Sequence, residues 1–156
     1  MIKGLIVGLQ FLTRLPVNIN MDFNEENIGR ATFFFPLIGM LLGIISFIPY
    51  YLIAKYSRSI ASFLVVFLMI LLTGGLHLDG VSDMVDGFFS SRDRERTLEI
   101  MADSRIGAFG VLSLILLIIF KLLVISNFTI SKNVMYALVF SMGNGRFNSL
   151  IAIAYK

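Results

Sequence analysis

The sequence predicts an all-α, polytopic integral membrane protein, and three observations support this fold class. Hydrophobic residues make up 57% of the 156 residues, charged residues make up only 15%, and the mean hydropathy is +0.87. Soluble domains typically contain about 45–50% apolar and about 25% charged residues. The apolar residues also come in long blocks, as bilayer-crossing helices require. These observations disfavour a water-soluble globule, a disordered chain and a nucleic-acid-binding tail, so we expect no nucleic-acid partner.

The first 16 residues predict an N-terminal interfacial or re-entrant helix. The apolar stretch between Lys3 and Arg14 has ten residues, whereas a span needs about 20. A signal peptide is disfavoured, because no small-x-small cleavage site follows and Arg14-Leu15-Pro16 interrupts the run. The polar residues 17–30 predict a loop or a surface turn.

Four apolar blocks predict four spans, at residues 31-54, 60-76, 107-128 and 134-155. In the first block Gly39 and Gly43 form a G-x-x-x-G pair, which permits close contact with another helix. The third block carries Lys121 in mid-span, where a lysine has to face the bundle or a cavity. The run 143–146, Gly-Asn-Gly-Arg, interrupts the fourth block.

The distribution of basic residues predicts the topology. Four crossings place both termini and the polar segment 77–106 on one side of the membrane. Eight basic residues lie on that side and three on the other: Lys3, Arg14, Arg30, Arg92, Arg94, Arg96, Arg105 and Lys156 against Lys55, Arg58 and Lys132. The positive-inside rule therefore places segment 77–106 on the cytoplasmic side.

Segment 77–106 is unusually acidic for this chain. It holds seven of the ten acids and four of the thirteen basic residues, a formal charge of −3 against +6 for the rest. Asp79, Asp83 and Asp86 have i, i+4, i+7 spacing, so on a helix they share one stripe about 60° wide. Carboxylates so close together repel one another unless a cation joins them. Acids at membrane depth are costly and usually functional, so the stripe predicts metal or proton chemistry.

The donor set favours a hard cation. The chain has one His and no Cys, so carboxylate oxygens have to dominate any metal site, which favours Mg²⁺, Mn²⁺ or Ca²⁺ over zinc or copper. Mg²⁺ is typically held by one or two carboxylates together with substrate phosphate oxygens.

The second half of the segment predicts a helix from about 92 to 103. On it, two cations and two acids share a face: Arg92, Arg96, Glu99 and Asp103. Arg105 follows and is suited to hold a phosphate by its planar fork. A solvated charged loop is the simpler explanation for residues 92–95, and His77 alone is more often interfacial or structural than a ligand. Carboxylates, Mg²⁺ and arginines together suit transfer at a phosphate or diphosphate, and no Walker loop is present.

The sequence also resembles a known family. Leu76-His77-Leu78-Asp79-Gly80, followed by Asp83, Asp86 and Gly87, is similar to the signature of the cobalamin synthase family, the adenosylcobinamide-GDP ribazoletransferases. The similarity extends to Phe11–Pro16, Phe35–Gly39 and Ile100–Gly107, and the blocks occur in family order.

The resemblance implies a multi-pass enzyme of the bacterial inner membrane, with 1-156 as a single membrane domain. It implies that adenosylcobinamide-GDP and α-ribazole, or its 5′-phosphate, are joined with Mg²⁺ and that GMP is released. Family members are substantially longer, so the resemblance implies a chain truncated at its C-terminus, and whether this chain alone is active is open.

The resemblance also implies roles for individual residues. The implied metal ligands are Asp79, Asp83 and Asp86, and the implied catalytic residues are Asp83, Asp103 and His77. Asp103 would add a metal ligand or act as base toward the ribose hydroxyl, and His77 would orient an aspartate or a phosphate. The implied substrate-binding residues are Arg14, Arg96, Arg105, Glu99 and Ser104.

Other classes stay open on the sequence alone. The Asp79-x3-Asp83-x2-Asp86 spacing approaches that of CDP-alcohol phosphotransferases and aromatic prenyltransferases, although no D-G-x2-A-R stretch is present. An ion-coupled transporter would use the acids to relay protons or bind cations, but no inverted repeat is visible. A non-catalytic membrane subunit and a homo-oligomer are also open.

Overall fold

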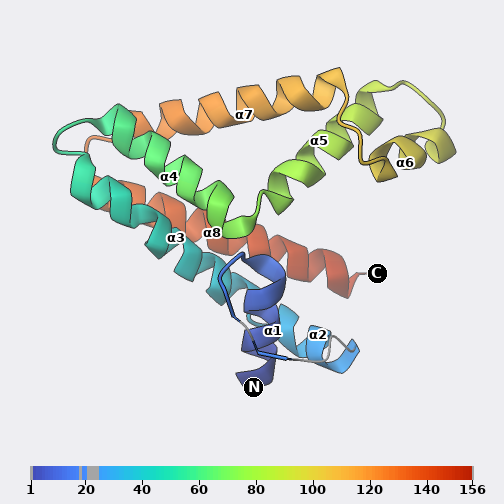
Figure 1. Cartoon of the computed structure of the whole chain (residues 1–156), viewed down its shortest axis with the longest axis horizontal. Coiled ribbons are helices and arrows are strands. Elements are labelled where there is room, and N and C mark those ends of the chain that lie inside the picture. Colours follow the sequence, from blue (N-terminus) through green and yellow to red (C-terminus); the bar gives the residue numbers. More distant parts are fainter. Residues whose placement is uncertain (1, 18, 21–24, 156) are drawn as a thin grey trace. The chain divides into compact units, whose positions relative to one another are not determined.

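A computed structural model describes residues 2–17, 19–20 and 25–155, and over these ranges the chain is all-helical, as predicted. The helices are α1 (Ile2–Leu12), α2 (Glu25–Thr32), α3 (Phe35–Ile53), α4 (Arg58–Thr73), α5 (Leu76–Phe89), α6 (Arg94–Ala102), α7 (Ala108–Asn127) and α8 (Ser131–Ala154) (Figure 1). They form two compact units. Unit 1 runs through Gly74 and resumes at Ile125, and unit 2 spans Gly75–Val124.

Within the described part of the chain, two helices, α3 and α7, are long and apolar enough to cross a membrane, and a third crossing arises if α4 and α5 count as one broken span. Alone, α4 has 16 residues, fewer than the roughly 20 that a bilayer requires. The 24-residue α8 contains the polar run 143–146. Length and composition therefore support two or three crossings, and the expected total of four stays a prediction.

Two local expectations were wrong. Residues 17–30 were expected to lack a helix, but α2 begins within them at Glu25. Burial of Ala31 in the apolar cluster with residues of α1 and α3 stabilises this helix. The run 143–146 does not interrupt α8, which continues through it. Gly143 lets α8 approach α3 there, since a Cβ on it would lie 2.9 Å from Cγ of Met40.

The G-x-x-x-G pair of α3 faces α8, as its spacing predicts. A Cβ on Gly43 would lie 2.8 Å from the carbonyl oxygen of Leu138, and a Cβ on Gly39 would collide with the carbonyl oxygen of Met142. Figure 1 shows α8 lying along α3. Glycines thus let the two backbones approach, and van der Waals contact stabilises such a helix pair even within lipid.

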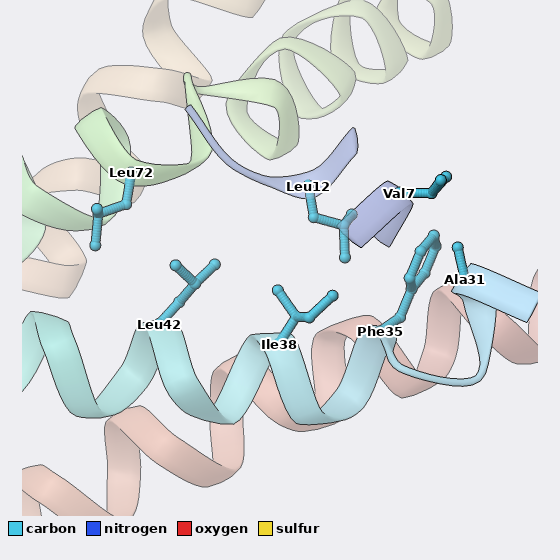
Figure 2. Close-up of a cluster of buried hydrophobic side chains, with 7 residues drawn as sticks. All are labelled: Val7, Leu12, Ala31, Phe35, Ile38, Leu42 and Leu72. Atoms are coloured by element: carbon cyan, nitrogen blue, oxygen red, sulfur yellow. The ribbon is translucent and has the colours of Figure 1, made fainter. Parts of the chain in front are cut away.

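An apolar cluster joins the first four helices (Figure 2). It consists of Val7 and Leu12 from α1, Ala31 from α2, Phe35, Ile38 and Leu42 from α3, and Leu72 from α4. Each of these side chains is at most 9% exposed. The short α1 therefore packs against protein along one face; its expected place at the membrane interface stays a prediction.

Candidate active site

Two glycines create the break from which α5 starts. Gly74 ends α4 with φ of 64°, and Gly75 precedes α5 with φ of 73°. Two successive residues adopt the left-handed backbone conformation essentially only when both are glycine. The break puts Asp79 in the first turn of α5, where the helix dipole favours a carboxylate.

The acidic stripe forms on α5 as predicted, but its third member is held by another helix. Asp79, Asp83 and Asp86 all lie within the helix. The Oδ2 atom of Asp86 accepts a hydrogen bond of 2.7 Å from the backbone N–H of Gly107, and Oδ1 accepts one of 2.8 Å from Gly110. Asp86 thus caps the start of α7.

The remaining two carboxylates fit the chemistry of Mg²⁺. Within the described ranges, no three His, Asp or Glu side chains gather closely enough to hold a metal ion. Asp79 and Asp83 lie one turn apart on one face of α5, and Mg²⁺ needs only one or two carboxylates when substrate phosphates complete its shell. Asp79 and Asp83 therefore suit the ion as donors, and the metal role of all three acids stays a prediction.

Asp103 and Arg105 form a pair in the loop between α6 and α7. Nε of Arg105 lies 3.1 Å from both carboxylate oxygens, and Nη2 lies 2.6 Å from Oδ2. The side-chain hydrogen bonds from Arg105, followed by one from its backbone N–H, lower the pKa of Asp103 from 3.8 to about 2. The same bond raises the pKa of Arg105. A carboxylate with so low a pKa is a weak general base near neutral pH. Ser104, between the two, is exposed.

The helix expected at 92–103 is shorter than predicted. Asp93 caps it, because Oδ1 accepts a hydrogen bond of 2.9 Å from the backbone N–H of Arg96. Arg92 therefore lies before α6, and Asp103 lies after it in an extended conformation. The predicted face of four charged residues is wrong; Arg96 and Glu99 alone share it, as an exposed ion pair. Exposed pairs of this kind contribute little stability.

His77 and Lys121 meet within unit 2. Nζ of Lys121 lies 3.3 Å from Nε2 of His77. The ammonium group of a lysine has no acceptor, so Nζ donates and the imidazole nitrogen accepts. Lys121, about two thirds of the way along α7, therefore contacts α5, in line with the expectation that it faces the bundle or a cavity.

Arg14 belongs to unit 1, whereas the other candidate residues belong to unit 2. Its backbone N–H donates a hydrogen bond of 2.7 Å to the carbonyl oxygen of Leu72. Its side chain lies over Gly74, where any Cβ would collide with Nε of Arg14. A cation is favourable at this position, the C-terminal end of α4.

The sequence analysis did not identify the two glycines whose backbone N–H groups bind Asp86. Gly107 and Gly110 have i, i+3 spacing at the start of an apolar block, which was a signal for close approach of another group. A Cβ on either would collide with the Asp86 carboxylate.

Fold and site together define a class: an apolar helical membrane protein whose polar segment carries aspartates and arginines of the kind that bind phosphate esters. A sequence model of the family described as cobalamin-5-phosphate synthase matches residues 4–156. The chain belongs to this family, and the resemblance stated from its motifs is confirmed.

Curated relatives agree with this assignment, and several are named adenosylcobinamide-GDP ribazoletransferase. One from Treponema denticola is 52% identical over 112 residues, which cover 72% of this chain and 43% of the relative. One from Caldanaerobacter subterraneus is 42% identical over 81% of this chain and 51% of the relative. One from Acetivibrio thermocellus is 39% identical over 96% of this chain and 60% of the relative. The chain thus spans about half the length of the curated relatives it matches, and no solved structure matches it.

Proposed function

We propose that this chain provides part of a membrane transferase that joins adenosylcobinamide-GDP to α-ribazole, or to its 5′-phosphate, and releases GMP. Family membership and the names of the relatives support this proposal. The structural observation that carries it is the face of α5 on which Asp79 and Asp83 lie one turn apart.

In the proposed reaction a ribose hydroxyl oxygen forms a bond to the phosphorus on the cobinamide side of the diphosphate. The bond from that phosphorus to the bridging oxygen breaks, GMP leaves with that oxygen, and the hydroxyl proton passes to water. Mg²⁺ at Asp79 and Asp83 would neutralise the charge of the diphosphate and of the leaving group. Binding of Mg²⁺ at these two residues would leave Asp86 hydrogen-bonded to the start of α7. Arg105 and Arg96 are proposed to bind phosphate oxygens.

The geometry of Asp103 supports a role other than metal ligand or base. Three side-chain hydrogen bonds from Arg105 hold the carboxylate, and a pKa of about 2 makes it a poor proton acceptor. We therefore assign to Asp103 the orientation of the Arg105 guanidinium group. His77, held by Lys121, is proposed to orient a phosphate or Asp79.

The location follows from the same assignment. The apolar helices α3 and α7 support insertion into a membrane. In the predicted topology, the side of the membrane that carries segment 77–106 has eight basic residues and the opposite side has three. This difference supports the cytoplasmic side of the bacterial inner membrane for the site.

GMP release from adenosylcobinamide-GDP and α-ribazole tests the proposal. The assay uses the chain in liposomes, with and without Mg²⁺, beside a version extended to the length of its relatives. We expect metal-dependent release that Asp83→Asn abolishes. Glu95→Gln, which removes an exposed acid from the same segment, is the matched control and should retain release. GMP release at the wild-type rate in Asp83→Asn would contradict the metal site. Absence of GMP release from the extended protein would contradict the reaction.

A further inference from the structure

Two consecutive residues of α5 anchor both ends of the loop that carries Asp103 and Arg105. Asp86 binds the start of α7, the helix after the loop. Side chains of α6, the helix before the loop, pack against Gly87. All of these residues lie within unit 2. The loop is therefore closed onto one short stretch of α5.

The Asp86 anchor is electrostatic and directional. Each carboxylate oxygen accepts one backbone hydrogen bond, from Gly107 at 2.7 Å and from Gly110 at 2.8 Å. The Gly107 amide directly precedes α7 and the Gly110 amide lies in its first turn. The N–H groups at this end of a helix have no partner within it, and the helix dipole favours a negative charge there. Bonds of this kind to a charged group are about twice as strong as neutral ones. The contact requires glycine at both positions, since a Cβ at either would occupy the place of the carboxylate.

The Gly87 anchor is steric. Gly87 is buried, and a Cβ on it would lie 2.5 Å from Cγ of Met101 and 3.3 Å from Cγ2 of Thr97. The last turn of α6 therefore packs on the backbone of α5 one residue after Asp86. Figure 1 shows α6 beside this end of α5.

We infer that Asp86 is a positioning residue, which fixes α7 to α5 and thereby holds the Asp103–Arg105 pair in place, and that Asp79 and Asp83 provide the carboxylates for the cation. The loop has only Asp103–Ile106 between α6 and Gly107, so displacement of Gly107 displaces Arg105, two residues away. The reaction that the loop serves rests on the proposed function, whereas the anchor itself does not.

Crosslinking measures the anchor without turnover. The sequence contains no cysteine, so Phe89→Cys with Phe109→Cys gives a unique pair on α5 and α7, at rings now stacked with centroids 5.2 Å apart. The pair is treated in liposomes with a short bismaleimide. Asp86→Asn should slow crosslinking about tenfold, the factor expected for one hydrogen bond to a charged group. Its amide NH₂ group would face one of the two N–H donors.

Three further variants separate anchoring from charge, from metal binding and from general loosening of the chain. Gly110→Ala keeps the carboxylate but displaces it, so it should slow crosslinking as Asp86→Asn does. Asp83→Asn removes an acid one turn away and should leave the rate unchanged. Leu42→Ala, which disturbs the core of unit 1, should also leave it unchanged, which shows that general loosening of the chain is not being measured.

Rescue is the second readout, and it separates a positioning residue from a metal ligand. In the extended protein, crosslinked Asp86→Asn should recover GMP release. The Mg²⁺ concentration that gives half-maximal release should be the same as in the wild type. An unchanged crosslinking rate in Asp86→Asn would overturn the inference. A raised Mg²⁺ requirement that the crosslink does not restore would overturn it too. If no variant releases GMP, the proposed function fails, while the crosslinking rates still decide the anchor.

Discussion

Nζ of Lys121 lies 3.3 Å from Nε2 of His77 and joins the first turn of α5 to the second half of α7. At the other end of α5, Asp86 binds the first turn of α7. Polar contacts therefore hold the two helices together at two levels. In an apolar environment such contacts matter more than in water, because a polar group without a partner is costly there.

The single histidine makes the first of these contacts directly measurable. His77 is the only His in the sequence, so its ¹⁵N imidazole signals need no assignment. Because Nε2 accepts from Lys121, the proton should reside on Nδ1. Lys121→Met keeps the length of the side chain and removes the donor, so it should shift the tautomer population toward protonated Nε2. Lys132→Met, which alters an exposed residue of α8, should leave the signals unchanged. Identical spectra for wild type and Lys121→Met would contradict the contact.

The Asp103–Arg105 pair predicts a pH dependence. Because the pKa of Asp103 is lowered from 3.8 to about 2, the pair is fully formed above pH 3.8 and is lost as the pH falls through about 2. ¹³C carboxyl NMR of labelled aspartate should show this low midpoint. Arg105→Gln should raise it toward 3.8, since the hydrogen bonds from Arg105 are the largest cause of the shift. Arg96→Gln should raise it only slightly, because Arg96 is the weakest contributor. A midpoint near 3.8 in the wild type would exclude the pair.

The contact between α3 and α8 predicts opposite effects for two glycine-to-alanine changes. Gly43→Ala places a Cβ 2.8 Å from the carbonyl oxygen of Leu138, so it should lower the free energy of unfolding by about 1–3 kcal/mol. Gly145→Ala adds a Cβ with no neighbour within 4 Å. It should leave stability unchanged or raise it by up to about 1 kcal/mol, because alanine favours the helix. Unfolding in mixed detergent and SDS micelles measures both. Equal effects would show that α8 does not lie against Gly43.

The apolar cluster of unit 1 predicts a matched difference on α3. Leu42 is 0% exposed and its neighbour Leu41 is 44% exposed. Leu42→Ala should lower the free energy of unfolding by about 2 kcal/mol or more, because it leaves a cavity. Leu41→Ala should cost less than about 1 kcal/mol, because nearly half of this residue is already exposed. The same micelle assay measures the pair, and similar losses would contradict the packing in Figure 2.

Much of the fold was predictable because it follows from local pattern. The apolar blocks predicted α3, α4, α7 and α8 within a few residues. The i, i+4, i+7 spacing of aspartates predicted a shared face of α5. The errors arose at short polar helices: α2 forms where a loop was expected, and Asp93 caps α6 so that Arg92 lies outside it. Composition alone does not distinguish a capped helix of two turns from a polar loop.

The sequence by itself determined the class of protein, its all-helical character and its family, because hydrophobic block length and motif order are properties of the chain. Tertiary structure decided which polar groups meet. Asp79, Asp83 and Asp86 are equivalent by spacing, yet only Asp86 lies where the free N–H groups of Gly107 and Gly110 converge. Such a hydrogen bond depends on how residues 21 and 24 positions apart come together, and no local periodicity encodes that approach.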